Sequence, residues 1–109
     1  MTYSDRAKAF AALHQPGNPV VLYNIWDAGS AKAIAGAGAS ALATGSFPVA
    51  AAQGFPDGEQ VPLEFVLGNA SRIIAATDLP VTIDFEGGYA REPEQLTANV
   101  KRLAETGAV

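Results

Sequence analysis

The segment from Thr82 to Tyr89 holds the residues best suited to chemistry, because it has two acidic side chains two positions apart. Side chains alternate between the faces of a strand, so Asp84 and Glu86 would share one face near the strand's carboxyl end. Two carboxylates held together repel each other and lose hydration, and a bound Mg2+ relieves both costs. The glycine pair 87–88 would let the chain turn sharply beside the cation. The pattern predicts a Mg2+ site at Asp84 and Glu86; the alternative is a solvated strand end that binds nothing.

Two earlier segments could hold or act on a substrate. Thr44, Gly45 and Ser46 follow a short apolar stretch, and their hydroxyl and backbone N–H groups suit a carboxylate or phosphate. The alternative is an ordinary turn of small residues. Asp57 lies in the turn-forming sequence Pro-Asp-Gly, where it could orient a substrate or a water molecule, or could make only an Asx turn. Because loops this long are uncommon without a function, we favour a catalytic role for Asp57.

The elements that must position these residues alternate in type along the chain. Apolar spacing, turn residues and β-branched content predict one helix followed by three strand–helix pairs. Ser4 would cap the first helix, and either Asp27 or Ser30 the second. On the third strand, Thr82, Asp84 and Glu86 would face away from the helices. The expected ranges are a helix at 5–14, a strand at 20–25, a helix to about 37, a strand at 41–44, a loop at 45–60, a helix at 62–76, a strand at 80–85 and a helix from Pro93.

Strands separated by helices indicate right-handed crossovers and a parallel sheet, so the fold class is α/β. The candidates are a doubly wound sheet and a TIM-type (β/α)8 barrel. No Gly-x-Gly-x-x-Gly turn follows the first strand, which disfavours the dinucleotide-binding form of the first. A barrel needs roughly 250 residues, and this chain has 109. We therefore expect residues 1–109 to be the N-terminal part of a truncated (β/α)8 barrel domain with about three units, and Ala108 and Val109 to start a fourth strand.

Composition excludes several classes of function. The net charge is −4 and no cluster of Lys or Arg exists, so a nucleic-acid partner is not expected. The sequence has no cysteine for a disulfide or a thiol nucleophile. No apolar run is long enough to span a membrane, which predicts a cytoplasmic protein without a membrane partner. Three units leave a sheet edge and one face uncovered, so we expect a homo-oligomer.

The same motifs give the chain a family resemblance that covers nearly its whole length. It resembles the isocitrate lyase/phosphoenolpyruvate mutase superfamily, and the motifs match in order and separation as well as in residues. The family commonly has Asp-x-Asp-Thr-Gly-Tyr where this chain has Asp-Phe-Glu-Gly-Gly-Tyr at 84–89. The matching stretches are Asn-Ile-Trp-Asp-Ala-Gly-Ser-Ala at 24–31, Ala-Thr-Gly-Ser at 43–46, Gly-Phe-Pro-Asp-Gly-Glu at 54–59 and Pro-Val-Thr-Ile-Asp-Phe-Glu-Gly-Gly-Tyr at 80–89.

The resemblance implies a Mg2+-dependent lyase or mutase that makes or breaks C–C or C–P bonds next to a small 2-oxo or enol carboxylic acid. By motif match, Asp84 would bind the metal directly and Glu86 would hold it through water. The loop Thr44–Gly45–Ser46 would cradle a carboxylate or phosphonate of the substrate, and Asp57 would lie beside the reacting group. Two alternatives stay open: an inactive truncated fragment, and a homologue that binds a carboxylate without turning it over.

Overall fold

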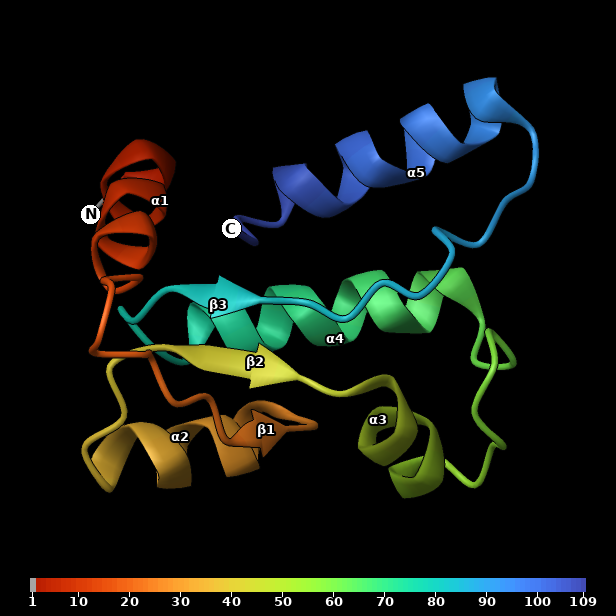
Figure 1. The fold of residues 1–109 in the computed structure, drawn as a ribbon. Coiled ribbons are helices and arrows are strands. Elements are labelled where there is room, and N and C mark those ends of the chain that lie inside the picture. Colours follow the sequence, from red (N-terminus) through yellow and green to blue (C-terminus); the bar gives the residue numbers. More distant parts are fainter. Residues whose placement is uncertain (1) are drawn as a thin grey trace.

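Three parallel strands in chain order form the centre of the structure. The computed structural model describes residues 2–109. The sheet order is β1-β2-β3, with Asn24 opposite Ala43 and Ala43 opposite Thr82. This confirms the predicted α/β class and the parallel neighbours (Figure 1). The elements are α1 (Tyr3–Ala12), β1 (Asn24–Ile25), α2 (Ala28–Gly36), β2 (Leu42–Thr44), α3 (Ser46–Ala52), α4 (Leu63–Ala75), β3 (Val81–Thr82) and α5 (Pro93–Glu105).

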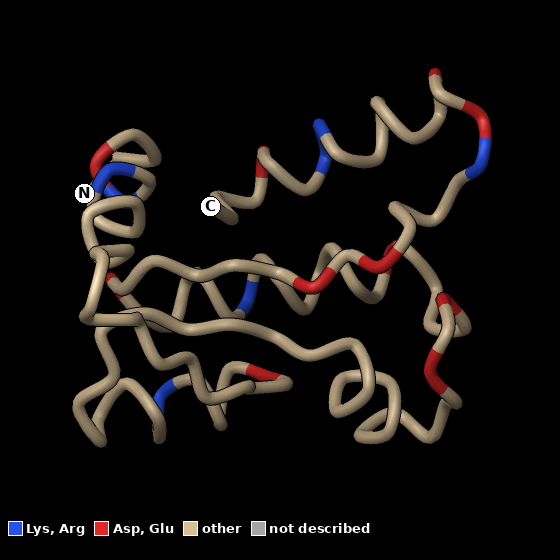
Figure 2. The backbone as a smooth tube through the Cα atoms, viewed as in Figure 1, with Lys and Arg blue, Asp and Glu red and all other residues tan. Residues whose placement is uncertain are grey.

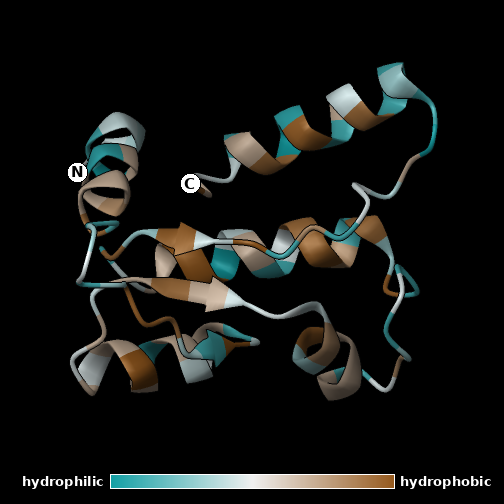
Figure 3. Cartoon of the chain, viewed as in Figure 1, coloured by the Kyte–Doolittle hydropathy of each residue, from teal (hydrophilic) through white to brown (hydrophobic). Residues whose placement is uncertain are grey.

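The hydrophobic core lies on one face of the sheet. Ile25, Leu42 and Val81 come from the three strands, and each is fully buried against apolar residues of α2, α4 and α5. Figure 3 shows hydrophobic residues on β2 and β3 and along α4. The predicted inward packing of β3 is confirmed, because Val81 and Ile83 pack into this core, and Asp84 between them and the following turn is exposed.

The first and third strands are shorter than the predicted ranges 20–25 and 80–85. Ladder pairing needs a partner, and β2 has only three residues. Residues 20–23 form no ladder pairs with it. At the other end of β2 the chain turns into α3, so the amide of Asp84 bonds to the Thr44 side chain, with Asp84 N and Thr44 Oγ1 3.0 Å apart, and no ladder continues.

Helix α3 replaces part of the predicted loop 45–60, and that prediction is wrong over residues 46–52. Pro48 is the third residue of the helix, where the missing N–H would have no intrahelical partner. Three consecutive alanines, the strongest helix formers, complete the turn. The helix lies at the carboxyl end of the sheet, opposite to α1 (Figure 1).

Helix α1 begins with a cap that differs from the predicted one. Thr2, rather than Ser4, is the N-cap: its hydroxyl accepts from the amide of Asp5, and the Asp5 carboxylate accepts from the amide of Thr2. A cap at Ser4 would have Ala7 in the position that returns the bond, and alanine has no acceptor. In α2, Asp27 is the cap and Ser30 returns the bond, so both predicted candidates take part.

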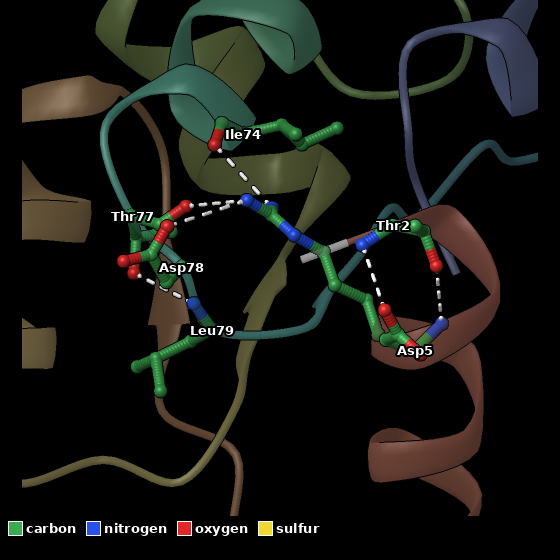
Figure 4. A network of polar contacts seen from close by, with 7 residues as sticks. Thr2, Asp5, Ile74, Thr77, Asp78 and Leu79 are labelled. Carbon is green, nitrogen blue, oxygen red and sulfur yellow. Dashed lines mark hydrogen bonds and ion pairs between the residues drawn. The ribbon is translucent and has the colours of Figure 1, made fainter.

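A long-range contact ties α1 to the rest of the chain. The guanidinium of Arg6 donates to the carbonyls of Ile74 at 3.5 Å and Thr77 at 3.0 Å, and lies 3.8 Å from the Asp78 carboxylate (Figure 4). Ile74 stands in the last turn of α4, where carbonyls lack helical partners. Arg6 therefore docks α1 at the amino end of the sheet.

The free edge of β3 receives the end of the chain. The amide of Val109 donates to the carbonyl of Val81 at 2.9 Å, and Ala108 is buried in the core. This agrees with the expected start of a fourth strand. Among residues 2–109, no helix combines the length and apolar character needed to cross a membrane.

Candidate active site

The carboxyl ends of β2 and β3 bring most of the predicted site residues together. The carboxylate of Asp84 accepts from the amide of Ser46 at 3.0 Å, and the amide of Asp84 donates to Thr44 Oγ1 at 3.0 Å. The second oxygen of Asp84 accepts from the amide of Glu86 at 3.2 Å. The two strand ends are thus joined by side-chain hydrogen bonds that fix the orientation of the Asp84 carboxylate.

The segment Thr44–Ser46, where β2 passes directly into α3, approaches β1 closely at its glycine. A Cβ on Gly45 would lie 2.8 Å from Asn24 Oδ1 and 3.0 Å from Pro48 Cδ, so a larger residue would push the loop away. The Thr44 side chain points to the helix side and is buried, with its hydroxyl engaged by Asp84. Among residues 2–109 the Ser46 hydroxyl makes no hydrogen bond, whereas the amide of the same residue donates to the Asp84 carboxylate.

Glu86 belongs to a second group of contacts, between the turn after β3 and the loop that connects α3 to α4. Its carboxylate accepts from the amide of Glu59 at 3.1 and 3.2 Å and from the Tyr89 hydroxyl at 3.1 Å. The Glu59 carboxylate in turn accepts from the amides of Gly87 at 2.7 Å and Tyr89 at 3.2 Å. Figure 2 shows the acidic residues of these two segments near the same end of the sheet.

Three carboxylates act on the phenol of Tyr89. Burial raises the pKa of Tyr89 well above its usual value, and the hydrogen bond to Glu86 and the negative charges of Glu86, Glu59 and Asp84 raise it further. Tyr89 therefore stays protonated and donates to Glu86 throughout the physiological range.

The backbone around these contacts is strained. Glu59, Glu86 and Tyr89 adopt left-handed conformations, with φ of 62°, 51° and 60°. For residues other than glycine this costs about 1–3 kcal/mol each, so surrounding contacts must hold them. Gly88 also has a positive φ, of 78°, and a Cβ there would overlap the Leu96 side chain.

The buried side chain of Asn99 supports the turn after β3. Asn99 is 1% exposed, and its amide donates to the carbonyls of Gly88 at 2.9 Å and Tyr89 at 3.3 Å. Gln95 completes the set by donating to Asn99 Oδ1 at 2.8 Å. Sequence reasoning missed both Asn99 and Glu59. A signal for Asn99 was present, because this polar residue falls three positions after Leu96 on the buried face of α5.

Asp57 stands apart from the other predicted site residues. It lies exposed on the loop between α3 and α4, and its carboxylate accepts from the amide of Gly58 at 3.0 Å. Within the described range 2–109, no hydrogen bond links it to the loop 44–46 or to Asp84. Its predicted catalytic role stays a prediction.

A cavity of about 20 Å3 lies behind the strand ends, next to α3 and α4. Its polar lining includes Thr44, Asp84 and Asn69, and the Asn69 amide donates to the carbonyl of Trp26 at 3.0 Å. This volume admits one water molecule and no organic acid.

At this end of the sheet, one of the two predicted carboxylates is free to bind a hard cation. Each Asp84 oxygen accepts one N–H group and keeps a lone pair, and the carboxylate is exposed. Over residues 2–109, no group of three or more His, Asp or Glu side chains is arranged to hold a metal. Mg2+ often uses only one or two protein carboxylates, with water and substrate completing its shell. Asp84 fits that role, whereas the Glu86 carboxylate is engaged by Glu59 and Tyr89.

Comparison with known proteins places this arrangement in a family. A family model described as phosphoenolpyruvate phosphomutase matches residues 10–109. An uncharacterized protein of Mycobacterium tuberculosis strain CDC 1551 is 35% identical over 99 residues, which are 91% of this chain and 38% of that protein.

Two crystal structures from Burkholderia cenocepacia J2315 are similar to the chain over nearly all its residues. A candidate phosphonomutase is 48% identical with a TM-score of 0.93, covering 96% of this chain and 43% of that one. A candidate lyase/mutase is 37% identical with a TM-score of 0.87, covering 97% and 38%. This chain thus spans about two fifths of the length of these relatives. The matched fold and the family model together show that the chain belongs to the phosphoenolpyruvate mutase/isocitrate lyase superfamily.

Proposed function

We propose that this chain supplies the part of a Mg2+-dependent active site that binds the metal and the substrate carboxylate. The reaction would make or break a C–C or C–P bond next to a small 2-oxo acid. The observation that carries the proposal is the carboxylate of Asp84, held at the carboxyl end of β3 by the amides of Ser46 and Glu86. Membership in a superfamily of lyases and mutases supports it.

Cleavage of a bond next to a 2-oxo acid leaves an enolate, whose negative charge must be stabilised. Mg2+, when bound, acts as a Lewis acid on the oxygens that develop this charge. Asp84 would hold the cation, with a smaller contribution of Glu86 through water. The fixed orientation of Asp84 means that little reorganisation is needed when the cation arrives.

The loop Thr44–Gly45–Ser46 would bind the carboxylate or phosphonate of the substrate. The free hydroxyl of Ser46 is the donor for that group, and Thr44 keeps the neighbouring strand end in place through Asp84. Gly45 lets the loop lie close to Asn24 on β1. Asp57 would lie beside the reacting group as the catalytic residue, since its carboxylate is exposed at the same end of the sheet.

Substitution of Asp84 tests the proposal in the protein expressed from its complete reading frame. A panel of 2-oxo acids, related hydroxy diacids and phosphonates is assayed with and without Mg2+. We expect Asp84→Asn to lower Mg2+-dependent kcat/KM by at least about 100-fold, because a charged ligand to the cation is lost. Glu86→Gln should cost less. Asp78→Asn is the matched control, because its side chain is 96% exposed at the opposite end of β3.

Three results distinguish the alternatives. Near-normal activity and Mg2+ affinity in Asp84→Asn would show that the site is assigned to the wrong residue. Metal-dependent binding of a carboxylate without any product would favour a binding protein. The 109-residue chain should bind Mg2+ only weakly in calorimetry, since it offers two carboxylates at most; tight binding would mean that these residues supply more ligands than we propose.

A further inference from the structure

Two glutamates from segments far apart in sequence each bind backbone amides of the other's segment. The amide of Glu59 donates to both oxygens of Glu86, and the Glu59 carboxylate accepts from the amides of Gly87 and Tyr89. We call this reciprocal set of bonds the Glu59–Glu86 clasp. Carboxylates of like charge repel, so the backbone N–H groups and the Tyr89 hydroxyl must compensate the two charges.

The backbone conformation is adapted to the clasp on both sides. Glu59 and Glu86 both have positive φ, of 62° and 51°, which side-chain-bearing residues rarely adopt without tertiary support. A Cβ on Gly87 would lie 2.9 Å from Glu59 Oε2, so a larger residue there would displace the carboxylate from its place in the clasp. These features agree with one another only when the two segments are in contact.

The clasp links the two segments that carry the proposed chemistry. Asp57 lies two residues before Glu59, and Asp84 lies two residues before Glu86. The Asp57 carboxylate itself contacts only the next amide along the chain within residues 2–109, so its own bonds do not fix its place relative to β3. Glu59 is the nearest anchor between the Asp57 loop and the turn after β3.

We infer that Glu59 is a positioning residue, which holds the loop bearing Asp57 against the turn after β3 and so sets the place of Asp57 relative to Asp84. The importance of this placement for turnover rests on the proposed function. The placement itself does not, and it is measurable without a substrate.

The test compares Glu59→Ala, Glu59→Gln and Tyr89→Phe, with Glu105→Ala as the control, because Glu105 is exposed and lies at the end of α5. Amide hydrogen exchange and backbone NMR relaxation are recorded on each. In Glu59→Ala we expect the amides of Gly87 and Tyr89 to exchange at least about tenfold faster, since each loses a charge-assisted bond. The order parameters of residues 57 and 58 should fall from about 0.85 to below about 0.6.

Glu59→Gln keeps an acceptor oxygen and should restore most of the protection and order. Tyr89→Phe removes only the hydroxyl bond to Glu86 and leaves the amide of Tyr89 bound to Glu59, so the loop should stay ordered. In the protein from the complete reading frame, Glu59→Ala should lower kcat at least about tenfold with KM changed by less than about threefold, because Asp57 is displaced while the substrate carboxylate is still bound.

Unchanged order at residues 57 and 58 in Glu59→Ala would overturn the inference. If Glu59→Ala loosens the loop but leaves kcat unchanged, the position of Asp57 does not matter for turnover. The proposed function would then still stand. Absence of turnover in the unmodified protein on the whole panel would instead refute the proposed function, and the relaxation and exchange measurements would still decide whether Glu59 positions the loop.

Discussion

Replacement of Asn99 by alanine should destabilise the fold by removing the support beneath the turn after β3. The side chain of Asn99 is almost fully buried, and it donates to the carbonyls of Gly88 and Tyr89. Alanine cannot donate, so the Gly88 carbonyl would be left buried without a partner. Gln95 would also lose its acceptor, although it lies nearer to solvent.

The size of the effect follows from the two carbonyls. An unsatisfied buried acceptor costs about 1–3 kcal/mol, and the bond to Gly88, at 2.9 Å, is both short and buried. The Tyr89 carbonyl is bonded at 3.3 Å and partly accessible, so water can replace most of that bond at a cost of roughly 0–1 kcal/mol. The expected loss is therefore about 1–4 kcal/mol in the free energy of unfolding, which lowers the melting temperature of a domain this size by roughly 4–30 °C.

Urea unfolding followed by circular dichroism measures this loss, with Asn18→Ala as the matched control. Asn18 is exposed in the turn after α1, and a surface change of this kind stays within about 0.5 kcal/mol. Asn99→Asp keeps the shape but turns a carboxylate oxygen toward two carbonyls, so it should be at least as destabilising at pH 7. If Asn99→Ala unfolds within about 0.5 kcal/mol of the unmodified chain, the carbonyls are satisfied in another way and the reasoning is refuted.

Two further predictions concern pH and association. The amide of Ser30 holds the pKa of Asp27 below its ordinary value of 3.8, so the cap stabilises α2 above that pH and loses its effect as pH falls through the lowered pKa. Asp27→Ala should therefore cost about 1 kcal/mol at pH 7 and less at pH 2 in urea unfolding, and an equal cost at both pH values would contradict this. The chain should also self-associate, because Val21 and Tyr23 are 65% and 67% exposed beside the free edge of β1. Light scattering should show oligomers that Tyr23→Lys weakens, and a folded monomer at high concentration would contradict this.

Helices with a strong apolar stripe could be predicted from the sequence almost to the residue. The helix expected at 62–76 is observed as α4 (Leu63–Ala75), and Pro93 begins α5 as expected. Local spacing is sufficient there because each helix satisfies its own backbone. The strand at 20–25 was overestimated for the opposite reason: a strand's length depends on its partner, and β2 begins only at Leu42, which leaves residues 20–22 without a partner.

One contact of the site could be predicted from the sequence and another could not, because only the first follows from strand pairing. The meeting of Asp84 with Ser46 follows from the parallel sheet, because neighbouring strands end at the same edge. The clasp depends on a left-handed backbone at Glu59 and Glu86, and glutamate gives no sequence signal for such a conformation. Glu59 could therefore not be recognised as a partner of Glu86 from the sequence.

The hydrogen bonds at the ends of β2 and β3 also fix the orientation of Asp84, the proposed metal ligand. Beyond β2, the Thr44 hydroxyl accepts the amide of Asp84, and the Asp84 carboxylate accepts the amide of Ser46. The ladder is thus continued by side chains for one more step, and this fixes the rotamer of Asp84 before any cation is present. A ligand already held in place loses little conformational freedom when it binds, so the cost of ordering the site falls on folding rather than on metal binding. If so, Thr44→Val, which removes the hydroxyl but keeps the side-chain shape, should weaken Mg2+ binding without altering any proposed metal ligand.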